Sequence, residues 1–148
     1  MALTTFSGPV HVGPNKETSG DGSIVVNQGN VVLNQSTTIS QTATGTKSAT
    51  ILLPTNAQIT SITVDVLTQW TSTTSSALTV GTVALGAQYV TSIDATTATT
   101  GRQAITFTGA QVVAMTNIGT NTNVVTTVAS VGATTTGAAF INVYYVQN

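Results

Sequence analysis

The chain has 148 residues, of which 41% are hydrophobic and only 5% are charged, and its formal net charge is −1. Three scattered basic residues (Lys16, Lys47 and Arg102) cannot neutralise a nucleic-acid backbone, and the lack of cysteine excludes disulfides and thiolate metal sites. The sequence contains no run of 18 apolar residues, the length that a membrane span would need. Its first residues lack the pattern of a signal peptide. We therefore expect a single domain with a real core and with no nucleic-acid or membrane partner.

Threonine fills about a fifth of all positions, far above its ordinary share. Its β-branched side chain favours strands over helices, and no window carries a sustained helical stripe, so the chain is predicted to be all-β. The scarcity of charge has two explanations. Either much of the surface is covered in a permanent assembly, or hydroxyl and amide groups alone keep the protein soluble.

The first 22 residues differ from the rest of the chain, because they hold two of the three prolines and nearly half of the charges. Two Gly-Pro pairs bracket a short alternating patch there. We predict an extended N-terminal arm over residues 1–22 and a β-sandwich body over residues 23–148. The alternative is a flexible terminus that binds nothing. If the arm docks on a neighbour, its contact candidates are Phe6, Val10, His11 and Val12.

The body is predicted to open with a hairpin over residues 23–34, followed by a polar link over residues 35–48. Residues 51–53 are apolar on both parities, which predicts a short strand covered on both faces. Pro54 then ends the strand, and Thr55-Asn56 has the composition of a turn. The clearest strand follows, because apolar residues alternate with polar ones, and the apolar set is Ile62, Val64 and Val66.

The second half of the chain continues the pattern of short strands and turns. A helical turn is plausible within residues 84–94, and the run 112–115 is short and apolar. Residues 138–146 are apolar on both parities, which is typical of a central strand. Further strands are predicted at 78–83, 102–108 and 124–131. About eight short strands at turn spacings of roughly ten residues indicate a β-sandwich or jelly roll.

Catalytic groups do not converge in the sequence. His11 falls in the predicted arm, where a general base could not be held rigidly. Paired carboxylate chemistry would need Asp65 with Asp94, but the first is predicted on the solvent side of its strand and the second in a loop. A nucleophile elbow, a phosphate-binding loop and a calcium-type acidic cluster are all missing. We expect no enzyme, no cofactor and no metal site.

Trp70 stands at the end of the clearest strand. The position favours a core residue, but tryptophans also concentrate at binding hot spots. Trp70 therefore joins the contact candidates, with a buried position as the favoured alternative.

Three runs carry a family resemblance: LPTNAQITSITVDVLTQW (residues 53–70), LTVGT (78–82) and FINVYYV (140–146). They resemble small capsid decoration (head cement) proteins of tailed bacteriophages, over residues 50–148. The resemblance implies a β-sandwich or jelly-roll body that sits as a homotrimer on the outer capsid surface, binds the major capsid protein and reinforces the shell. It also implies contacts by the N-terminal segment, here residues 1–22. The alternatives are another virion β-protein, from a tail, fibre or head–tail junction, and a carbohydrate-binding adhesive sandwich.

Overall fold

A computed structural model describes residues 15–18, 24–27, 31–134 and 136–147. The chain divides into two compact units, Met1–Val31 and Val32–Asn148. The sequence placed the boundary between arm and body earlier, after residue 22, and the role of the arm stays a prediction. Its contact candidates Phe6, Val10, His11 and Val12 lie outside the described residues.

In the first unit, strand β1 (Asn15–Thr18) pairs antiparallel with β2 (Ile24–Asn27). The hairpin predicted over residues 23–34 is therefore wrong, because β2 pairs with the strand before it and not with residues 31–33. Val31 and Val32 lie outside any strand, and Leu33 begins β3, which pairs with the last strand of the chain. The local apolar runs predicted the strand β2 but could not specify which segment completes the ladder.

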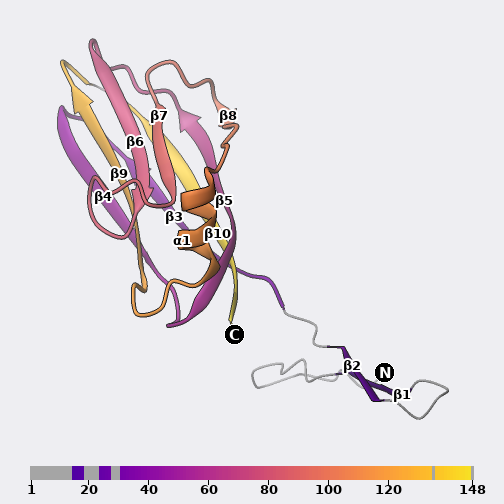
Figure 1. Cartoon of the computed structure of the whole chain (residues 1–148). Coiled ribbons are helices and arrows are strands. Elements are labelled where there is room, and N and C mark those ends of the chain that lie inside the picture. Colours follow the sequence, from indigo (N-terminus) through magenta and orange to yellow (C-terminus); the bar gives the residue numbers. More distant parts are fainter. Residues whose placement is uncertain (1–14, 19–23, 28–30, 135, 148) are drawn as a thin grey trace, which may run out of the picture. The chain divides into compact units, whose positions relative to one another are not determined.

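The second unit is a sandwich of two four-stranded antiparallel sheets, with strand orders β3-β10-β5-β8 and β4-β9-β6-β7 (Figure 1). The predicted all-β sandwich is confirmed, and the finer jelly-roll assignment stays a prediction. The elements are β3 (Leu33–Ser40), β4 (Gly45–Leu52), β5 (Ala57–Thr68), β6 (Ser75–Gly81), β7 (Val90–Asp94), β8 (Gly101–Arg102), α1 (Gly109–Thr116), β9 (Asn123–Val131) and β10 (Ala138–Gln147).

The core lies between the two sheets. Along β5, Ile62, Val64 and Val66 are buried, while the residues between them are partly exposed, so the predicted half-buried strand is confirmed. Strand β10 lies between β3 and β5 and buries Ile141 and Val143 completely, which confirms the predicted central strand. Hydrophobic burial between the sheets is the main force that holds them together.

The strand around residues 51–53 is covered on one face, not on both as predicted. It forms the end of β4, an edge strand, in which Ile51 is buried and Leu52 is 63% exposed. An apolar run cannot by itself distinguish an edge strand from a central one. The turn at Thr55-Asn56 is confirmed, and Asn56 adopts a positive φ of 59°, which asparagine tolerates.

Residues 35–48 are not a polar link, because most of β3 and the first half of β4 occupy this range. Both are edge strands whose residues are mostly exposed, and their sequences are rich in serine and threonine. Apolar alternation is weak in such strands, since few of their side chains enter the core. The hydrogen-bonded ladders with β9 and β10 hold them in place instead.

Two predictions between residues 84 and 108 are wrong. Residues 90–94 form β7, where a helical turn was expected. Of the strand predicted over residues 102–108, only Arg102 lies in a strand, as the last residue of β8. The one helix among the described residues, α1, follows at Gly109–Thr116 and packs on β5. The edge strands β3 and β4 belong to different sheets and contact each other at one side of the sandwich. Helix α1 lies at the other side.

Candidate contact surface

The acidic and basic groups of the second unit do not converge on one site. Arg102 Nε donates to Asp65 Oδ1 at 3.0 Å, and this hydrogen bond raises the pKa of the guanidinium. Asp94 belongs to the other sheet, at the end of β7. The described residues contain no group of three His, Cys, Asp or Glu side chains that could hold a metal ion.

Asp94 is bound within its own turn. Its Oδ1 accepts the backbone N–H of Thr96 at 3.0 Å, and its Oδ2 accepts the hydroxyl of Thr97 at 3.0 Å. These hydrogen bonds, the backbone one first, lower the pKa of the carboxyl. Its side chain therefore has a structural role. The residue was predicted to lie in a loop, whereas it is the last residue of β7. In the part of the chain that the structure describes, no helix is long and apolar enough to cross a membrane.

Trp70 belongs to the core rather than to a contact surface. Its side chain is 1% exposed, and its indole N–H donates to Gln41 Oε1 at 3.1 Å. A buried indole requires such an acceptor, and the connection between β3 and β4 supplies it. The burial of Trp70 contradicts its prediction as a contact residue and agrees with the alternative, a position in the core.

A row of hydrogen-bonded polar side chains crosses the outer face of the sheet that contains β10 and β5. Asn142 Nδ2 donates to Thr63 Oγ1 at 3.3 Å and to Asp65 Oδ2 at 3.4 Å. Arg102 extends this row on the neighbouring strand β8. These four side chains therefore use one another as hydrogen-bond partners.

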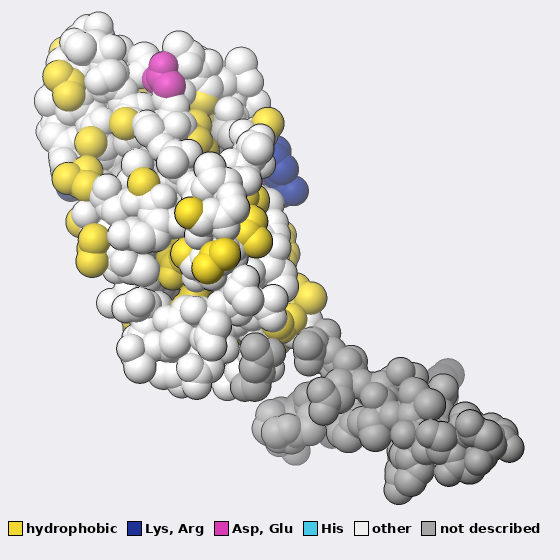
Figure 2. Space-filling view, viewed as in Figure 1, with side chains coloured by type: hydrophobic (Ala, Val, Ile, Leu, Met, Phe, Trp, Pro, Cys, Tyr) yellow, Lys and Arg dark blue, Asp and Glu magenta, His cyan; other side chains and the backbone are white. Residues whose placement is uncertain are grey.

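Helix α1 presents aliphatic side chains to solvent. Its buried residues are Gln111 and Met115, whereas Val112 is 51% exposed and Val113 is 73% exposed. Apolar side chains gather over α1 in Figure 2. Its first turn is fixed by a capping box, in which Thr108 Oγ1 accepts the backbone N–H of Gln111 and Gln111 Oε1 accepts that of Thr108.

The loop between β6 and β7, residues 82–89, also exposes aliphatic side chains. Val83 and Leu85 are each 59% exposed. The backbone N–H of Leu85 donates to Thr127 Oγ1 at 3.1 Å, which ties the loop to β9. Leu85 has a φ of 62°, a conformation that costs a leucine about 1 kcal/mol or more. The loop therefore holds an apolar side chain outward at some conformational cost.

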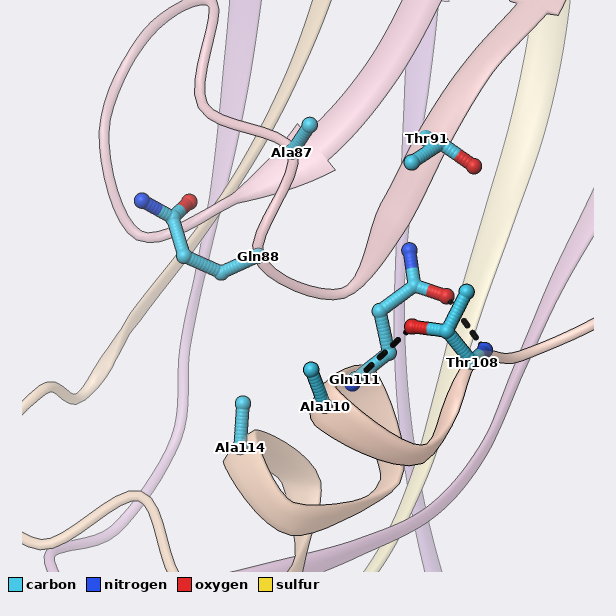
Figure 3. A pocket seen from close by; sticks show the side chains of 7 residues that line it. All are labelled: Ala87, Gln88, Thr91, Thr108, Ala110, Gln111 and Ala114. Atoms are coloured by element: carbon cyan, nitrogen blue, oxygen red, sulfur yellow. Dashed lines mark hydrogen bonds between the residues drawn. The ribbon is translucent and has the colours of Figure 1, made fainter.

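A cavity of about 330 Å³ lies between this loop and α1 (Figure 3). No charged side chain lines it. One wall comes from the loop and β7, the other from α1 and the residue before it; the lining residues are Ala87, Gln88, Thr91, Thr108, Ala110, Gln111 and Ala114. We call these residues together with Val83, Leu85, Val112 and Val113 the helix–loop surface.

No residue of the helix–loop surface was predicted from the sequence to be a contact residue. The spacing Thr108-x-x-Gln111 before an apolar run is a capping-box signature and could have predicted α1. The outward direction of Val112 and Val113 could not be predicted, because the run 112–115 contains both buried and exposed positions. Nothing in the sequence indicated that the loop at 82–89 would lie beside it.

No family model matches the chain, and a comparison with curated proteins finds no match. Among solved structures, a chain of the cyanophage Pam1 capsid asymmetric unit is similar in structure, with a TM-score of 0.55. The two chains share a fold. The alignment covers 100% of this chain and 96% of that chain, at 18% sequence identity.

Proposed function

We propose that this protein is a structural component of a phage particle that binds the outer surface of the capsid shell and reinforces it, as a homotrimer. The supporting observation is the likeness to a chain of a cyanophage capsid asymmetric unit, which extends over nearly the full length of both chains. The resemblance of residues 50–148 to capsid decoration proteins points to the same role from a separate source, the sequence.

The chemistry of the second unit fits a protein that acts by contact. Its described acidic groups are occupied by local partners, Asp65 by Arg102 and Asp94 by its own turn. The helix–loop surface exposes four aliphatic side chains and carries no charge. Burying such a surface against another protein avoids the large cost of removing charges from water. A protein that binds only the assembled shell stabilises that shell by mass action.

The N-terminal unit is proposed as a second contact, with Phe6, Val10, His11 and Val12 as its candidates. An arm that reaches a neighbouring subunit would add binding energy without a larger body. A closed homotrimer would present three copies of each contact at once, and such multivalency raises the apparent affinity well above that of one contact.

The test uses shells of the parent phage that lack this protein. Purified protein is added, the shells are sedimented, and the bound amount is measured together with the temperature at which the shells open. We expect saturable binding and a higher opening temperature. Protein that neither sediments with the shells nor changes their opening temperature would refute the proposal.

Three further measurements separate the finer parts of the proposal. Gold-labelled antibody on intact particles distinguishes the shell from the tail, fibre or junction. Mass photometry of the free protein tests the homotrimer. Deletion of residues 1–22 is expected to leave the body folded and to weaken attachment, and undiminished attachment would refute the contact role of the arm.

A further inference from the structure

The cavity between α1 and the loop at residues 82–89 contains a hydrogen-bond donor without a partner. Among the described residues, three buried side-chain polar atoms lack a partner, namely Thr79 Oγ1, Thr126 Oγ1 and Gln111 Nε2. Of these residues only Gln111 lines the cavity. Its side chain is 5% exposed, so water outside the protein does not replace the missing partner freely.

The orientation of Gln111 is fixed by the helix cap. Its Oε1 accepts the backbone N–H of Thr108 at 2.8 Å, and the amide nitrogen must then point the other way. Figure 3 shows this nitrogen directed toward the side of Thr91, across the cavity from the helix. A buried donor left unpaired costs about 1–3 kcal/mol, so an acceptor that enters the cavity would recover this cost.

The other residues that line the cavity indicate which chemical group could supply the hydrogen-bond acceptor. Three of the seven lining residues are alanines, Ala87, Ala110 and Ala114, whose short side chains leave the cavity open and apolar. No cation lines the cavity, so nothing there would compensate an anionic ligand. The lining therefore suits a neutral group with one carbonyl oxygen and a short aliphatic body, which is the chemistry of a peptide carbonyl beside an aliphatic side chain.

We infer that this cavity is a socket for an uncharged loop of the capsid protein, which inserts an aliphatic side chain and accepts a hydrogen bond from Gln111 Nε2 through a backbone carbonyl. The inference rests on the proposed function, because it takes the shell as the source of the loop. The exposed Val83, Leu85, Val112 and Val113 belong to the elements on either side of the socket and would extend the apolar contact around it. These surrounding contacts would exclude water from the hydrogen bond, as the contacts around a binding hot spot do.

The experiment compares full-length variants in sedimentation with shells that lack the protein. Ala110→Leu fills the socket with a larger side chain. Leucine has nearly the same helix propensity as alanine, so the substitution should not disturb α1 itself. Ala43→Leu is the matched control, since it makes the same substitution at an exposed alanine that belongs neither to the socket nor to the helix–loop surface. Gln111→Glu, measured at pH 8, keeps an acceptor for the Thr108 N–H and removes the donor. Far-UV circular dichroism and thermal unfolding establish that each variant is folded.

We expect Ala110→Leu and Gln111→Glu each to weaken shell binding by about tenfold or more, and Ala43→Leu to change it by less than about threefold. Two folded socket variants that bind shells as well as the unchanged protein would overturn the inference and leave the proposed function standing. Loss of the homotrimer, without a direct effect on shell binding per trimer, would also overturn it by making the occupant a second copy of the chain. Failure of the unchanged protein to bind shells would instead refute the proposed function.

Discussion

The indole N–H of Trp70 donates a hydrogen bond to Oε1 of Gln41 at 3.1 Å, with both residues buried. The same oxygen accepts the hydroxyl of Ser130 at 2.8 Å, and Gln41 Nε2 donates to the carbonyl of Gly45 at 2.7 Å. Gln41 lies where the chain passes from β3 to β4, and Trp70 where it passes from β5 to β6. The pair therefore joins two of the segments that connect the sheets.

Gln41→Leu should destabilise the protein strongly. The leucine retains much of the volume but leaves the buried Trp70 N–H without its acceptor, at about 1–3 kcal/mol. It also removes one of the two partners of the Ser130 hydroxyl, which keeps its hydrogen bond with Ser76. We expect a loss of about 2–4 kcal/mol in the free energy of unfolding, measured by urea denaturation. Gln147→Leu, at an exposed position, is the control and should stay within about 0.5 kcal/mol. A Gln41→Leu protein as stable as this control would contradict the role of the hydrogen bonds.

Gly137→Ala tests the packing against the same tryptophan. A Cβ on Gly137 would overlap atoms of the Trp70 indole, and the indole is fully buried and cannot withdraw. We expect a loss of about 1–3 kcal/mol in the free energy of unfolding from overpacking. In Gly109→Ala, at the start of α1, the new Cβ meets nothing within 4 Å, so this control should be neutral or slightly stabilising. Equal effects of the two substitutions would show that the contact with Trp70 is unimportant.

The sequence predicted the strands that contribute strongly to the core. In β5 the alternation of Ile62, Val64 and Val66 is complete, because one face is buried and the other is not. In β10 the apolar character on both parities reflects a central strand with neighbours on each side. Both predictions succeeded because burial in a sheet determines which residue types can occupy each parity.

The edge strands and the helix were harder to predict for physical reasons. Strand β3 exposes most of its residues, so serine and threonine replace the apolar alternation, and only Ile39 enters the core completely. Helix α1 is short, and its formation depends on the capping box at Thr108 and on contact with β5 rather than on an apolar stripe. The helix–loop surface depends on tertiary contacts between segments distant in sequence, such as Leu85 with Thr127, which periodicity does not encode.

Asp94 should contribute to the dependence of stability on pH. Hydrogen bonds from the Thr96 N–H and the Thr97 hydroxyl lower its pKa below the value in the unfolded chain. The stabilisation is therefore present above the ordinary carboxyl pKa and is lost as the pH falls through the lowered pKa. Asp94→Asn keeps an oxygen acceptor but cannot titrate.

The measurement for Asp94 is urea denaturation at several values between about pH 6 and pH 2, where carboxyls titrate. We expect the unchanged protein to lose more stability than Asp94→Asn over this range. The difference should be small, because the carboxylate is exposed and solvent screens it. Parallel pH profiles of the two proteins would contradict the assignment.

Leu85→Asn should separate stability from attachment. Asparagine tolerates the positive φ of 62° at this position better than leucine does, and the side chain is 59% exposed, so little packing is lost. The hydrogen bond to Thr127 uses the backbone N–H and persists in the variant. We expect the free energy of unfolding to stay within about 0.5 kcal/mol or to rise, while shell binding weakens because an aliphatic contact is lost.

Leu52→Asn, which replaces an exposed leucine outside the helix–loop surface, is the matched control for removing a surface leucine. If Leu85→Asn binds shells as tightly as Leu52→Asn does, the loop at residues 82–89 is not part of the contact, and its unusual backbone conformation would need another explanation.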